Sequence, residues 1–123
     1  MYLTLNNKEM ELNFGIRFLR EVDKRTERTI VTNGYEQKFS EGLAYYLPQI
    51  MMGNPVALST ILDCALWKNK GKYKPSDIDE LLDNLSEEDY ENLFDSVLKE
   101  LEESNGSKKL VVMMKKELEK QMK

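Results

Sequence analysis

Few side chains in this 123-residue chain are suited to catalysis. Histidine is absent from the sequence, which excludes histidine-based acid–base catalysis and histidine metal ligands. The single cysteine, Cys64, lies in an apolar segment with no histidine to activate it, so we interpret it as a buried structural thiol. Residues 53–55 (Gly-Asn-Pro) lack the glycines and the lysine of a phosphate-binding loop. The sequence therefore predicts neither an enzyme nor a cofactor site.

Acidic residues in the second half of the chain resemble a metal site only superficially. Asp77, Asp79 and Asp83 follow a helical pattern, without the loop glycine and the bidentate glutamate of an EF-hand. We interpret them as helix-capping and solubilising residues, and we expect no bound metal.

Nucleic-acid binding is not favoured either, because the net charge is −4. The best basic cluster is interleaved with Glu21, Asp23 and Glu27, which is typical of a charge-balanced, solvated helix face. Its basic members are Arg17, Arg20, Lys24, Arg25 and Arg28. We therefore expect no nucleic-acid partner.

Membrane and secretory signals are weak. No apolar run approaches the roughly 20 residues that span a bilayer, and the N-terminal residues lack the order of a signal peptide. A lone cysteine is typical of a reducing compartment. We expect one soluble cytoplasmic domain without a membrane partner.

The elements that would position any site are mostly helical. Residues 2–12 predict a β-hairpin with Asn6-Asn7 as its turn and Leu3 opposite Met10. A helix over residues 13–25 would cover the apolar face of this hairpin. Residues 26–38 carry the turn signal Asn33-Gly34 and form either a second small hairpin or a mobile loop.

Four further helices are expected after this segment. Ser40 is the predicted N-cap of the first, which Pro48 bends and Gly53 ends. Asn54 caps an apolar central helix over residues 56–67, in which Cys64 and Trp67 are core residues. Capping signals at residues 76–79 and 86–89 begin the next two. The fold class is mainly α: an N-terminal β-hairpin followed by a compact bundle of about five to six helices.

The charge changes sign near the end of the chain. Residues 77–103 are acidic with Lys99 as their only base, whereas the residues after Ser104 are rich in lysine. We predict a domain over residues 1–104 and a basic amphipathic tail helix over residues 105–123. The two charged segments are either solvated faces, or they fold together or join neighbouring copies.

Two sets of residues are candidates for interaction surfaces. The tail has an apolar stripe that needs a partner, and thioether side chains suit adaptable contacts. The predicted partner-binding residues are Leu110, Val111, Met113, Met114, Leu118, Lys115 and Lys116. The predicted self-association residues, in the N-terminal hairpin, are Tyr2, Leu3, Leu5 and Met10.

The order of these features resembles the tail assembly chaperones of bacteriophages with long, non-contractile tails, especially phages of Gram-positive bacteria. The resemblance covers nearly the whole chain, from the hairpin and residues 14–23 to the lysine-rich tail. Its most specific parts are residues 54–58 (Asn-Pro-Val-Ala-Leu) and residues 101–105 (Leu-Glu-Glu-Ser-Asn).

The resemblance implies a helical chaperone that binds the tape measure protein, keeps it soluble, and promotes polymerisation of the tail tube protein around it. Such a chaperone acts in the host bacterial cytoplasm, is absent from the mature virion, and forms a homo-oligomer. A ribosomal frameshift often gives the family a longer form, and the codons of Lys108-Lys109 or Lys115-Lys116 are candidate slippery sites. The alternative function is a small acidic adaptor or regulatory protein that binds a phage or host protein.

Overall fold

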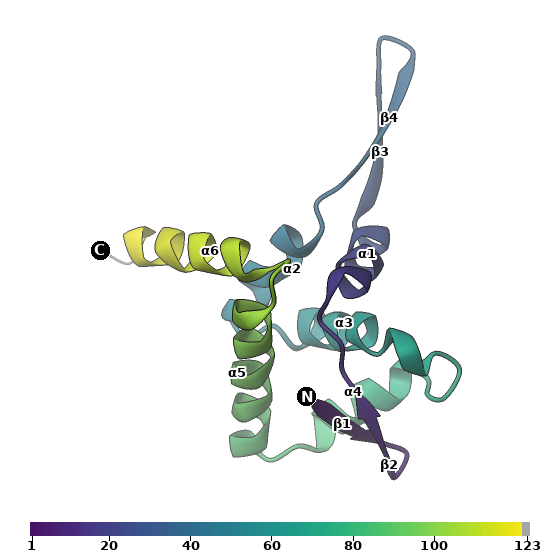
Figure 1. The fold of residues 1–123 in the computed structure, drawn as a ribbon, viewed down its shortest axis with the longest axis vertical. Coiled ribbons are helices and arrows are strands. Elements are labelled where there is room, and N and C mark those ends of the chain that lie inside the picture. Colours follow the sequence, from purple (N-terminus) through teal and green to yellow (C-terminus); the bar gives the residue numbers. More distant parts are fainter. Residues whose placement is uncertain (122–123) are drawn as a thin grey trace.

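The computed structural model describes residues 1–121, and it confirms the mainly α fold with a hairpin at the N-terminus (Figure 1). Residues 122 and 123, the end of the predicted tail, lie outside the described part. The strands are β1 (Tyr2–Leu5), β2 (Lys8–Glu11), β3 (Glu27–Thr32) and β4 (Tyr35–Ser40). The helices are α1 (Ile16–Arg25), α2 (Leu43–Met51), α3 (Pro55–Ala65), the 3-10 turn η1 (Trp67–Asn69), α4 (Pro75–Asn84), α5 (Glu87–Glu103) and α6 (Lys108–Gln121).

The N-terminal hairpin has the predicted turn and register. Asn6 and Asn7 adopt positive φ angles of 53° and 62°, as a two-residue turn requires, and Leu3 lies opposite Met10. Leu3, Leu5 and Met10 point into the core and are buried. The hairpin therefore uses its apolar face to complete the domain.

Residues 27–40 form a hairpin, which decides between the two possibilities left open by the sequence. Asn33 and Gly34, with φ of 53° and 81°, make the two-residue turn between β3 and β4. Both strands are exposed along their whole length, and the hairpin extends away from the helices (Figure 1).

Helix α3 lies at the centre of the fold, as its apolar circumference predicts. Asn54 is its N-cap and accepts hydrogen bonds from the amides of Val56 and Ala57, at 3.0 and 3.4 Å. Leu58, Ile61 and Leu62 are fully buried against neighbouring helices. Helices α1, α2 and α4 all pack on α3.

Two predicted helix caps are wrong, whereas Ser86 caps α5 as expected. Ser40 is the last residue of β4, and Gly42 takes the N-cap position of α2 with a φ of 61°. In α4 the N-cap is Lys74, whose amide donates to the Asp77 carboxylate at 2.8 Å. Both errors arise because the position of an N-cap residue depends on where the strand or loop before the helix ends.

Helix α6 turns sharply from α5 and packs on the domain with its first turns (Figure 1). Val111 is fully buried, and Ser107 is buried with its hydroxyl donating to the carbonyl of Leu101. A side chain at Gly106 would meet the end of the Leu19 side chain of α1 at 2.6 Å, so Leu19 would have to shift. Whether residues 105–123 act as a separate unit stays a prediction.

None of the helices in residues 1–121 combines the length and the apolar character needed to cross a bilayer.

Candidate interaction surfaces

The side chains with chemical potential are used for structure in the described part of the chain. Cys64 is buried, and burial raises the pKa of its thiol to about 11, so it stays protonated at neutral pH. Trp67, the other core prediction, is half-buried and packs against the core, with the Arg17 guanidinium 5.7 Å from its ring centre.

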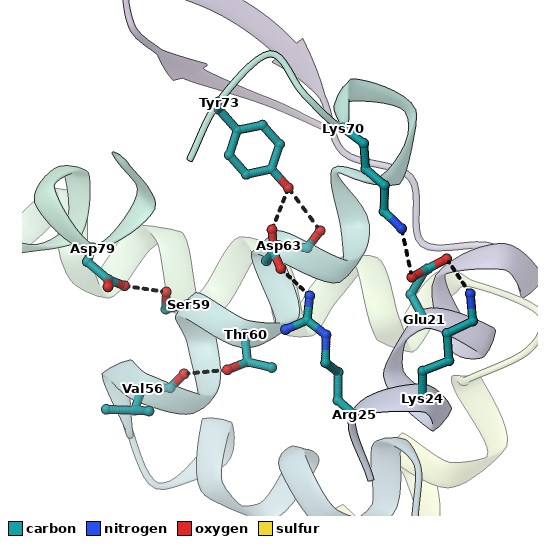
Figure 2. Close-up of polar contacts among 10 residues, drawn as sticks. All are labelled: Glu21, Lys24, Arg25, Val56, Ser59, Thr60, Asp63, Lys70, Tyr73 and Asp79. Carbon is teal, nitrogen blue, oxygen red and sulfur yellow. Dashed lines mark hydrogen bonds and ion pairs between the residues drawn. The ribbon is translucent and has the colours of Figure 1, made fainter. Parts of the chain in front are cut away.

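Asp63 of α3 is the centre of a polar cluster that joins three segments (Figure 2). Its carboxylate pairs with Arg25 at the end of α1 and accepts a hydrogen bond from the Tyr73 hydroxyl. Burial and this hydrogen bond raise the pKa of Tyr73 well above its usual range. The cluster fixes α1 and the loop before α4 onto α3.

Glu21 of α1 is the centre of a second polar cluster (Figure 2). It is the one buried carboxylate in the described structure. It accepts hydrogen bonds from Arg17, Lys24 and Lys70 at 3.1, 3.3 and 3.4 Å. Burial alone would raise the pKa of Glu21, but these three cations together lower it below its ordinary value. The predicted solvated face is thus charge-balanced as expected, but its central residue is in the interior.

Two acidic residues of α4 make side-chain hydrogen bonds. Asp77 caps the helix, and Asp79 accepts a hydrogen bond from Ser59 of α3 at 2.6 Å (Figure 2). With Asp83 and Arg25, Asp79 lines an open groove of about 400 Å³ between α3 and α4. Among residues 1–121, no three or more His, Cys, Asp or Glu residues are grouped as a metal site requires.

The predicted partner-binding stripe is divided between two faces of α6. Val111 is fully buried, Leu110 and Met114 pack partly against the core, and Leu118 is half-buried. Lys115 is exposed and donates to Glu102 of α5 at 3.1 Å. Leu110, Val111, Met114 and Lys115 therefore attach α6 to the domain, whereas Leu118 lies nearer its C-terminal end.

The opposite side of α6 is exposed in the described structure. Met113, 54% exposed, and Val112, 44% exposed, lie beside Lys116 on this side. Together with Glu102, Lys108 and Lys109 they line an open groove of about 530 Å³. We call this the α6 surface. The sequence analysis missed Val112, although Lys109, Val112, Met113 and Lys116 share a helical spacing of three to four residues.

The predicted self-association residues are mostly unavailable in this structure. Their role in self-association stays a prediction, but Leu3, Leu5 and Met10 are buried by their own domain. The reason is that the two-stranded hairpin needs this face covered to be stable. Tyr2 alone of the four is exposed, at 60%.

Two further apolar surfaces were not anticipated. A groove of about 480 Å³ between α2 and α5 has Tyr90 and Phe94 in its wall and Glu87, Glu91 and Asp95 at its rim. Met52, the residue that follows α2, is 81% exposed and is not among the residues that line this groove. The second surface is one face of the β3–β4 hairpin, described below.

Comparison with protein families gives a match over most of the chain. The family model described as "Phage tail assembly chaperone protein, TAC" matches residues 2–116. Neither the curated proteins nor the solved structures include a match to this chain.

Proposed function

Because the chain belongs to the phage tail assembly chaperone family, we propose that it binds the tape measure protein, keeps it soluble and promotes polymerisation of the tail tube protein around it. The chaperone binds stoichiometrically, is displaced by tube subunits, and is left out of the mature virion. This places its action in the cytoplasm of an infected host. We propose a phage with a long, non-contractile tail and a Gram-positive host.

The observation that carries the proposal is the α6 surface. Val112 and Met113 offer exposed apolar area, and a flexible thioether adapts to irregular partners. Lys108, Lys109 and Lys116 surround them. A long helical protein with an exposed apolar stripe flanked by acidic residues fits this chemistry, because the apolar residues are covered and the lysines pair with carboxylates.

Truncation is a poor test of this surface, because Val111 belongs to the core and its removal would damage the domain. Point substitutions on the free side are cleaner. We expect the double variant V112S/M113S to fold normally and to lose binding, because both side chains are exposed.

The experiment is co-expression of the tape measure protein with the chaperone, followed by measurement of the soluble tape measure fraction and of the complex on size-exclusion chromatography. Met52→Ser is the matched control, since it removes an even more exposed methionine outside the α6 surface. The proposal is supported if V112S/M113S no longer binds and solubilises the tape measure protein, whereas M52S still does. Equal solubilisation by wild type and V112S/M113S refutes the role of this surface.

The longer form of the protein that the family suggests can be tested from the coding sequence and its protein products. We propose a programmed frameshift at the codons of Lys108-Lys109 or Lys115-Lys116. Mass spectrometry of the protein expressed from the native gene would reveal the longer product. A coding sequence without a slippery heptamer and without an overlapping downstream frame would overturn this part.

A further inference from the structure

The β3–β4 hairpin has an apolar face and unpaired strand edges. Its register places Ile30, Tyr35 and Phe39 on one face, and all three are exposed. Both strands are exposed throughout and project from the helices (Figure 1). A two-stranded hairpin without further packing is barely stable in water, and added strands stabilise it. The hairpin is therefore a surface on which another strand can pair.

The turn determines which backbone groups of β4 are free. Thr32 and Tyr35 flank the two-residue turn, so they form a hydrogen-bonded pair, and bonded and non-bonded pairs alternate from there. Every second residue from Tyr35 onward thus bonds to β3. The amides and carbonyls of Glu36 and Lys38 point away from β3, along the open edge.

The open edge of β4 is complementary to itself. When two β4 strands run antiparallel with Gln37 opposite Gln37 of a second copy, Glu36 lies opposite Lys38 and Tyr35 lies opposite Phe39. Glu36 and Lys38 are the residues with outward backbone groups, so each such pair exchanges both hydrogen bonds. The same register therefore matches hydrogen bonds, charges on one face and aromatic rings on the other.

The edge of β3 has no such match. Its charged residues, Glu27 and Arg28, are adjacent and point to opposite faces of the strand. Residues opposite each other in a symmetric antiparallel pair must lie on the same face. The charges of β3 therefore cannot pair between copies, and this distinguishes the two edges.

We propose that two copies of this chain associate through their β4 edges, which joins the two hairpins into one four-stranded antiparallel sheet. Within one copy Lys38 lies 3.9 Å from Glu27 and remains 70% exposed, so it is available to Glu36 of the second copy. The contact lies outside the α6 surface. Each dimer would therefore carry two α6 surfaces, which favours binding to a long partner.

Charge exchange tests the register. Glu36→Lys or Lys38→Glu alone places like charges opposite each other at both symmetric pairs, and we expect the dimer Kd to rise about tenfold. The double variant E36K/K38E restores both pairs and should dimerise like wild type. An equimolar mixture of E36K and K38E should form a heterodimer, because every pair in it is again attractive.

These equilibria are measured by analytical ultracentrifugation at several concentrations. A wild-type chain that stays monomeric overturns the proposal. Dimerisation of E36K and K38E with the wild-type Kd also overturns it, because the contact would then lie elsewhere. The proposal is also overturned if E36K and K38E each fail to dimerise and their equimolar mixture forms no heterodimer. That result would point to another occupant of the β4 edge.

A cross-link tests the geometry independently. Opposite residues of a non-bonded antiparallel pair have Cα atoms about 4.5 Å apart, within disulfide range. Mild oxidation of Gln37→Cys should therefore give a covalent dimer on a non-reducing gel. Thr29→Cys, equally exposed on β3, is the control; a Q37C variant that cross-links no faster than T29C contradicts the register.

Discussion

Val111 and Val112 are neighbours on α6 with opposite surroundings, and this makes them a quantitative test of how α6 is attached. Val111 is fully buried, whereas Val112 is 44% exposed. Val→Ala removes two methyl groups, which at Val111 costs about 2 kcal/mol from lost burial and the cavity left behind. The higher helix propensity of alanine returns about 0.5 kcal/mol at both positions, so it cancels between the two variants.

We therefore expect V111A to lower the free energy of unfolding by about 1.5 kcal/mol and V112A to change it by at most about 0.5 kcal/mol. Urea unfolding followed by circular dichroism measures both, with the same slope expected for each variant. Equal stability of V111A and V112A would refute the packing of α6 on the domain. It would instead favour residues 105–123 as an independent tail.

Three further predictions concern the core and its caps. Glu21→Gln should lower stability by up to about 1 kcal/mol at pH 7, because it weakens charge-assisted hydrogen bonds whose three cations are more than half exposed and therefore screened by water. Folding lowers the pKa of Glu21, so the ionised carboxylate stabilises the folded state above its ordinary pKa, and this stabilisation is lost as the pH falls below that pKa. Urea unfolding of the wild type should therefore show a lower free energy of unfolding in acid than at pH 7. The decrease should be smaller in E21Q. Asn54→Ala should cost about 1 kcal/mol through the lost N-cap, while Asn92→Ala on an exposed part of α5 should cost almost nothing in the same assay. Cys64 should react with a thiol reagent only after unfolding, because it is buried and protonated; fast reaction in buffer would contradict its placement.

Periodicity and turn chemistry predict most of this fold. The Asn6-Asn7 turn, the cap at Asn54 and the buried central helix follow from local rules, because a few neighbouring residues determine each of them. The family resemblance, carried by residues 2–12 and 54–58 among others, agrees with the family match over residues 2–116.

Features that depend on distant residues were harder to predict. Glu21 belongs to an apparently solvated helix face, and one of its three cationic partners, Lys70, comes from another segment. The stripe of α6 was identified, but residues from two of its sides were assigned to one surface: Val111 and Met114 pack on the domain, whereas Met113 is exposed. A helical spacing alone does not say which neighbour covers each side of a helix. Leu3 and Met10 were likewise predicted as self-association residues, although their own domain covers them.

The base of the β3–β4 hairpin is closed by a hydrogen bond from the Gly42 amide to the Thr26 hydroxyl, at 2.7 Å, and by the ion pair of Arg28 with Glu41. The ends of α1 and α2 are therefore held together at the point where the hairpin leaves the domain. Residues 27–41 therefore act as a loop whose two ends are held together by the domain. The entropy lost on closing such a loop is smaller when the loop is shorter. The arm can thus be exchanged for a brief glycine-rich connection while the helical core persists, which makes it a replaceable module of the chaperone.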